Sequence, residues 1–179
     1  MKKFALLILS LSVPKYAFAN NFDYHTFEVR AATGTETVGG EVYLPLNQNS
    51  HVITRFDSHL ERDWDTAVGL GFNGPVNRRM DIYGQILGHH VKYTEAVSIE
   101  ESEDSVVYAE INFGARFWLS DRVEISGHYG RLMNDDDEKS AFIIGTRFHS
   151  TPQFSVGIDW KNYQVYEHQL ALSVRFSYR

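Results

Sequence analysis

Hydrophobic and polar residues alternate along most of the chain with a period of two, and no convincing helical period of about 3.6 residues follows position 20. The clearest segment spans 170–178, where large apolar residues at even positions face small or polar residues at odd positions. A second clear segment spans 107–117, with the apolar residues at odd positions. Because successive side chains of a strand point to opposite faces, this pattern predicts strands with one apolar and one polar face.

The same alternation, stronger in some places than in others, recurs over the rest of the chain. We expect strands at residues 24–32, 38–44, 51–60, 64–72, 80–86, 107–117, 123–129, 141–149, 154–160 and 170–178. An even number of strands lets an antiparallel sheet close with both chain ends at one rim. The sequence therefore predicts an all-β fold, a closed antiparallel barrel of about ten strands, with eight as the alternative.

The expected connections alternate in character. Four are compact and rich in turn residues: Pro45–Ser50, Asn73–Arg78, Leu119–Arg122 and Ser150–Gln153. The connections between them are Glu61–Asp63, Tyr93–Asp104, Asn134–Lys139 and Asn162–Glu167, one of them long and two strongly acidic. This asymmetry is typical of barrels with short periplasmic turns and more elaborate extracellular loops.

Residues 1–19 have the pattern of a secretory signal peptide. Lys2 and Lys3 precede an apolar run at residues 4–13, and Ala17-Phe18-Ala19 has the small-x-small form of a cleavage site. The apolar run is shorter than the roughly 20 residues that a spanning helix needs. We expect cleavage before Asn20 and a single barrel domain over residues 20–179.

Composition narrows the class of protein further. The chain has no cysteine, so a disulfide framework and a thiolate metal site are both excluded. Its net charge of −6 becomes −9 without the expected leader, which carries three lysines and no acidic residue. No basic stripe suited to nucleic acid is present, and no cofactor is expected.

Alternation alone does not say which face points outward, because a secreted barrel with an apolar cavity would show the same pattern. Three features favour lipid outside. Glycine and alanine recur on the polar face, where small residues make room for long charged partners, and aromatic residues crowd the strand ends, where a membrane girdle belongs. The polar face also mixes both signs of charge, which we expect to pair across the lumen: Glu28, Arg30, Glu41, Arg55, Asp57, Asp81, Glu110, Arg116, Glu124, Arg147, Asp159, Lys161 and Arg175. The expected girdle is Trp64, Phe72, Phe117, Trp118, Phe148, Phe154, Trp160 and Tyr178.

With its leader, its alternating strands, the short turn at 119–122 and the closing strand at 170–178, the chain resembles the small porin-like outer-membrane β-barrel proteins of the OmpA and OmpX type. The resemblance is architectural, and it implies a cell outer-membrane location in a Gram-negative bacterium. In that group the last residue is usually an aromatic that the assembly machinery recognises, whereas here Tyr178 is followed by Arg179.

Candidate chemistry is sparse. Ser126 and His128 share the polar face two residues apart and are the nearest approach to a nucleophile and its base. His89 and His90 are adjacent, so they point to opposite faces and cannot chelate one ion together. The acidic runs at 100–104 and 135–138 lack the spacing of an EF-hand loop and read as solvated surface loops, though divalent ions bridging them to lipopolysaccharide are an alternative.

These patterns favour a non-enzymatic, porin-like protein that is structural or passes small solutes weakly. Two alternatives stay open: a barrel enzyme acting on lipid A or peptides, and a surface adhesin acting through the acidic loops. The expected partners are outer-membrane lipid, lipopolysaccharide and the barrel-assembly machinery, and the expected oligomeric state is a monomer.

Overall fold

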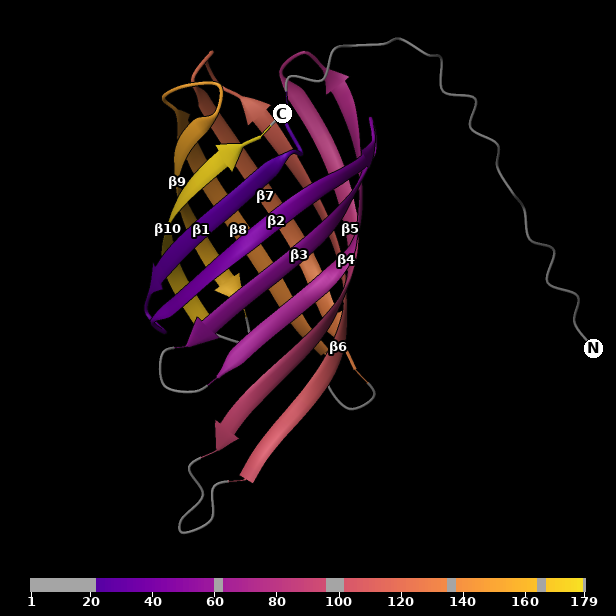
Figure 1. Ribbon diagram of the computed structural model, residues 1–179, viewed down its shortest axis with the longest axis vertical. Helices are drawn as coiled ribbons and strands as arrows, with labels where there is room; N and C mark the ends of the chain where they lie inside the picture. The colour runs from indigo at the N-terminus through magenta and orange to yellow at the C-terminus, as the bar shows by residue number, and fades with distance from the viewer. Residues whose placement is uncertain (1–21, 60–62, 96–101, 135–137, 164–166, 179) are drawn as a thin grey trace, which may run out of the picture.

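A single antiparallel sheet of ten strands closes on itself (Figure 1). The computed structural model describes residues 22–59, 63–95, 102–134, 138–163 and 167–178. The strands are β1 (Thr26–Thr33), β2 (Thr37–Asn47), β3 (Ser50–His59), β4 (Trp64–Asn77), β5 (Met80–Glu95), β6 (Ser102–Trp118), β7 (Val123–Met133), β8 (Glu138–His149), β9 (Phe154–Tyr163) and β10 (Glu167–Ser177). The prediction of a closed barrel of ten strands is confirmed, and the alternative of eight is wrong.

Each strand pairs with its neighbour in sequence, and β1 pairs with β10 to close the barrel. β1 begins and β10 ends at the same rim, which also carries the connections at residues 48–49, 78–79, 119–122 and 150–153. We call this the turn rim, and the opposite end the loop rim. The expected leader, residues 1–19, lies outside the described residues.

Two predicted turns at the turn rim prove shorter than the sequence indicated. β2 continues past Pro45 and β4 past Pro75, each with a register shift at the proline, so the connections at 48–49 and 78–79 are only two residues long. A proline cannot donate a ladder hydrogen bond, and the irregularity accommodates it within the strand. The side-chain oxygens of Asn47 and Asn77 accept hydrogen bonds from the backbone N–H groups of Asn49 and Arg79, at 2.9 and 2.7 Å.

At the loop rim, the predicted loop Tyr93–Asp104 is also too long. Pairing of β5 with β6 continues to Glu95 and Ser102, which leaves only residues 96–101 between the strands. β4 pairs with β5 only as far as Lys92, and β7 pairs with β6 only as far as Ala109. The β5–β6 hairpin therefore projects beyond the rest of the loop rim, as Figure 1 shows.

The two faces of the sheet differ sharply in chemistry. Along β1, buried Thr26, Glu28 and Arg30 alternate with exposed Phe27 and Val29. The same division holds in the other strands, so apolar side chains cover the outside and polar side chains the inside. The interior is not wholly polar, because two small apolar clusters also point inward: Val91, Tyr108, Leu132 and Ala141 near the loop rim, and Ile53, Ala67 and Leu87.

Glycines on the inner face provide room for these side chains and for close backbone approach. A Cβ at Gly39 would collide with the Asp57 carboxylate, and one at Gly145 with that of Asp159. At Gly69 a Cβ would meet the backbone carbonyl oxygen of Ile86, which cannot turn aside as a side chain can. These inward glycines are therefore part of the packing of the lumen.

Candidate functional site

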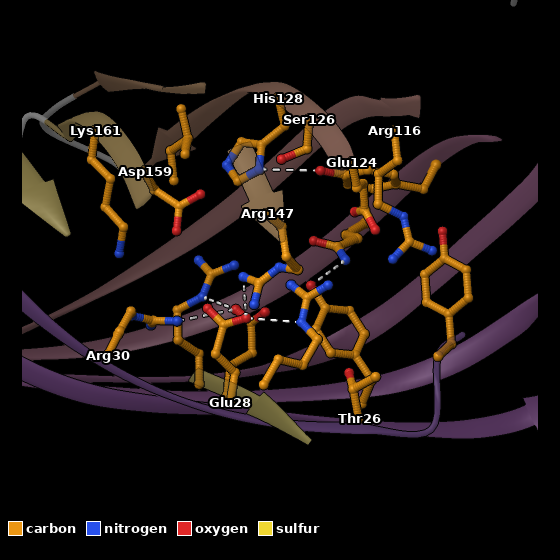
Figure 2. A pocket seen from close by; sticks show the side chains of 18 of the residues that line it. Thr26, Glu28, Arg30, Arg116, Glu124, Ser126, His128, Arg147, Asp159 and Lys161 are labelled. Carbon is orange, nitrogen blue, oxygen red and sulfur yellow. Dashed lines mark hydrogen bonds and ion pairs between the residues drawn. The ribbon is translucent and has the colours of Figure 1, made fainter. Parts of the chain in front are cut away.

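The lumen is lined by charged side chains from almost every strand. The structure places all thirteen residues of the expected ionic lattice on the inner face. Figure 2 labels seven of them around the central cavity: Glu28, Arg30, Arg116, Glu124, Arg147, Asp159 and Lys161. They come from every strand but β4, and that strand contributes Asp65, which the sequence analysis did not include. The alternation of charged and apolar positions was sufficient to assign these residues to one face, because side-chain direction in a strand has a period of two.

Glu28 on β1 is the centre of the first group of ion pairs. Its Oε2 accepts hydrogen bonds from Arg147 Nη2 on β8 at 2.7 Å and from Arg175 Nε on β10 at 2.9 Å. Arg147 Nη2 also donates to the Ser173 hydroxyl at 3.0 Å. The Arg147–Glu28 pair spans three strand positions around the ten-stranded ring, so it crosses the lumen as a chord.

A second group joins β1, β2 and β3. The Arg30 guanidinium donates to both oxygens of Asp57, at 2.9 and 2.6 Å, which is the bidentate geometry that makes arginine–carboxylate pairs strong. Arg55 Nε donates to Glu41 at 2.8 Å, and Arg30 Nη1 lies 3.6 Å from the same carboxylate. These two arginines therefore share Glu41 between them.

The third group is a buried histidine held between two carboxylates. His89 Nδ1 lies 3.0 Å from Asp65, and its Nε2 lies 2.6 Å from Glu110. Both nitrogens face carboxylate oxygens, so an imidazolium that donates from both satisfies the arrangement. Arg55 Nη1, 3.7 Å from Glu110, links this group to the second one.

The sequence analysis missed this histidine group, although it placed His89 and His90 on opposite faces, as the structure does. His89 faces Ala67 on β4 and Tyr108 on β6, so Asp65 and Glu110 reach it diagonally from both neighbouring strands. Only the register of two hairpins brings the three residues together. The only signal in the sequence for this group was that Asp65, His89 and Glu110 occupy inward positions on three consecutive strands.

A fourth group lies at the turn rim, where the segment before β1 folds into the barrel. Phe22 and Tyr24 are only 4% and 8% exposed, and the Tyr24 hydroxyl donates to Asp81 at 2.6 Å. Arg116 lies over both aromatic rings, 4.7 and 4.3 Å from their centroids. Burial and the Asp81 carboxylate hold the pKa of Tyr24 well above its usual value, so the hydroxyl keeps the proton that it donates. The sequence analysis had extended the first strand over Tyr24 and so did not predict that residues 22–24 form a plug at the turn rim.

Ser126 and His128 both line the lumen, as Figure 2 shows. Among the described residues, however, no hydrogen bond joins them. His128 Nδ1 lies 3.4 Å from the Tyr83 hydroxyl instead. Ser126 is therefore not hydrogen-bonded to the base that a nucleophilic serine requires.

Seven of the eight expected girdle residues lie on the outer face. Trp64 and Trp160 lie towards the loop rim, and Phe154 packs edge-on against Phe176 at the turn rim, with ring centroids 5.2 Å apart. Trp118 is the exception, and its assignment to the girdle was wrong. Because it directly follows outward-facing Phe117, it points inward and stacks against Phe22, with ring centroids 5.6 Å apart.

The described residues line a cavity at the centre of the lumen and another towards one rim. The central one has a volume of only about 100 Å³ and is lined by the lattice residues. The other, of about 730 Å³, lies at the turn rim. Both are lined by Asp23, Thr26, Arg116, Glu124 and Arg175, which therefore form a neck between them.

Most of the acidic runs lies outside the described part of the chain. Within it, Glu138 forms an exposed ion pair with Arg131 at 2.6 Å. Among the described residues, no group of acidic residues and histidines is arranged to hold a metal ion. No helix in the same residues is long and apolar enough to cross a membrane.

Comparison with known proteins gives a likeness of fold. No protein-family model matches the chain, and no curated protein matches it either. The N-terminal barrel domain of Pseudomonas aeruginosa OprF is similar with a TM-score of 0.52 and 12% identity, over 85% of this chain and 96% of that one. The KdgM porin is similar with a TM-score of 0.56 and 6% identity, over 86% of this chain and 99% of that one. The closed barrel and these likenesses together show that the chain has the fold of the small outer-membrane β-barrel porins.

Proposed function

We propose that the chain is an outer-membrane protein whose barrel is closed to all but water and small ions, so that its role is mainly structural. Lipid would contact the apolar outer face, with the turn rim towards the periplasm and the loop rim towards the cell exterior. We also propose that it acts as a monomer, that the barrel-assembly machinery inserts it, and that lipopolysaccharide surrounds the loop rim. The apolar outer surface and the aromatic side chains at both ends support this arrangement.

The observation that carries the proposal is the filling of the lumen by paired charges. Ten strands about 4.8 Å apart and tilted by about 40° give a backbone diameter of about 20 Å, wide enough for a bore if the side chains were small. Instead, Arg147 and Arg55 reach Glu28 and Glu110 across the ring, and the central cavity holds only about 100 Å³. Phe22 and Tyr24 narrow the turn rim further.

Planar-bilayer conductance tests the proposal. We expect the wild-type barrel to show small or unresolved steps, and Arg147→Ser to show larger ones. This variant removes a guanidinium that crosses the lumen, while Glu28 keeps Arg175 as a partner and is not left as a lone buried charge. Arg131→Ser, in an exposed pair, is the matched control and should leave conductance unchanged.

A shift of gel mobility on heating confirms folding of each variant before conductance is measured. Liposome swelling adds a second readout, because a wild-type barrel that admits a monosaccharide would overturn the closed lumen. The enzymatic and adhesive alternatives gain no supporting observation from the described residues.

A further inference from the structure

The cavity of about 730 Å³ at the turn rim lies between the neck and the short turns. Its walls come from the β6–β7 and β8–β9 connections, the ends of β6 and β10, and the segment before β1. It is far larger than the central cavity, so it has room for a small molecule that the central cavity does not have.

Two side chains on this wall carry buried hydrogen-bond donors that no atom of the described residues satisfies. Arg116 is only 8% exposed, and its Nε and Nη2 have no hydrogen-bond partner among the described residues. Its nearest carboxylate, Asp81, lies 3.6 Å from Nη2, beyond hydrogen-bonding distance. The indole Nε1 of Trp118 is buried and also has no hydrogen-bond partner within the described part of the chain. A buried donor without an acceptor costs free energy, so both groups favour an acceptor inside the cavity.

Three carboxylates line the cavity, those of Asp23, Asp121 and Glu124, and two of them are already engaged. Glu124 pairs with His149 at 3.1 Å, and Asp23 accepts hydrogen bonds from the backbone and ring of His25. On the β6–β7 turn, Arg122 adds a further cationic side chain to the rim of the cavity. The wall therefore offers guanidinium and indole N–H donors around one space.

We propose that this cavity binds an organic oxyanion, a small molecule that carries a carboxylate or phosphate group on a ring. Arg116 and Arg122 would take the charged group, since guanidinium groups match the geometry of both kinds of oxyanion. The ring itself would be uncharged and would lie against Trp118. Binding at this site does not require the lumen to conduct, so a failure to bind would leave the proposed function unaffected.

Tryptophan fluorescence of the folded barrel in detergent tests the proposal. Trp64 and Trp160 are first replaced by phenylalanine, so that Trp118 alone reports. Glucose 6-phosphate, glucuronate and glucose are then titrated, because they share one ring and differ in carrying a phosphate, a carboxylate or neither. We expect both anions to change the Trp118 emission at concentrations where glucose does not.

Variants identify the residues responsible. Since a hydrogen bond to a charged group is involved, Arg116→Gln should weaken binding of both anions about tenfold or more. Calorimetry of Trp118→Phe, which keeps the ring but removes the N–H, should show severalfold weaker binding. Arg131→Gln, at the opposite rim, is the matched control and should bind as the parent does.

Arg122→Gln covers the case in which Arg116→Gln fails to fold, because Arg122 is exposed on a turn. It should fold normally and bind the anions severalfold more weakly. Anions that bind no better than glucose would overturn the proposal, and so would binding that Arg122→Gln and Trp118→Phe both leave unchanged.

Discussion

Replacing Glu28 by glutamine removes the carboxylate that holds two arginines inside the barrel. The side chains of Glu28, Arg147 and Arg175 are 6, 7 and 16% exposed, so neither guanidinium regains full hydration when the carboxylate is lost. Two charge-assisted hydrogen bonds, at 2.7 and 2.9 Å, lose their ionic character. Breaking a buried pair in this way costs about 3–5 kcal/mol, and we expect Glu28→Gln to lower the free energy of unfolding by this amount.

Urea titration in lipid vesicles, read by the mobility shift on heating, measures this change. Glu36→Gln, at an exposed position of the β1–β2 connection, should change the free energy of unfolding by less than about 0.5 kcal/mol. The double variant Glu28→Gln/Arg147→Gln should regain part of the lost stability, because one stranded cation is gone. A Glu28→Gln barrel within about 1 kcal/mol of the wild type would refute the reasoning.

Three further predictions concern packing and the plug. Gly69→Ala should destabilise the barrel by about 1–3 kcal/mol, because its Cβ would meet the Ile86 carbonyl. Gly88→Ala is the control and should not destabilise it, because the space around Gly88 is open. The same urea titration compares the two variants. Tyr24→Phe should lower the free energy of unfolding by about 1.5–3 kcal/mol through loss of the bond to Asp81. Because the pKa of Tyr24 is raised, the wild type should also lose stability as the pH rises above about 10, and Tyr24→Phe should lose less. Phe22→Ala should raise conductance in planar bilayers by removing a buried ring that packs against Trp118 and narrows the turn rim, whereas Phe113→Ala, on the outer face, should leave it unchanged.

Much of the architecture followed from alternation alone. The inward direction of Glu28 and Arg30, and the outward direction of Phe27 and Val29, could be predicted from their positions in the sequence. The extension of β2 past Pro45 could not, because a proline usually marks the end of a paired strand.

The partners of the charged residues could not be predicted in the same way. Arg147 and Glu28 are 119 positions apart, and they meet only because pairing of β1 with β10 closes the ring and brings β8 within three strand positions of β1. The inward direction of Trp118 was available from its neighbour Phe117, but the aromatic cluster at that strand end obscured it. The direction of a side chain is a local property of its strand, whereas a contact between side chains across the lumen depends on the number of strands and on their register.

The central claim, that the apolar face meets lipid and the charged face encloses a lumen, can be tested with the protein's own tryptophans. Trp160 points outward and is 42% exposed, whereas Trp118 points into the turn-rim cavity. Two variants that each retain one of these residues, with the other tryptophans replaced by phenylalanine, are folded into vesicles containing brominated phospholipid. We expect strong quenching of Trp160 and little quenching of Trp118. Equal quenching of the two, or no quenching of Trp160, would contradict the account.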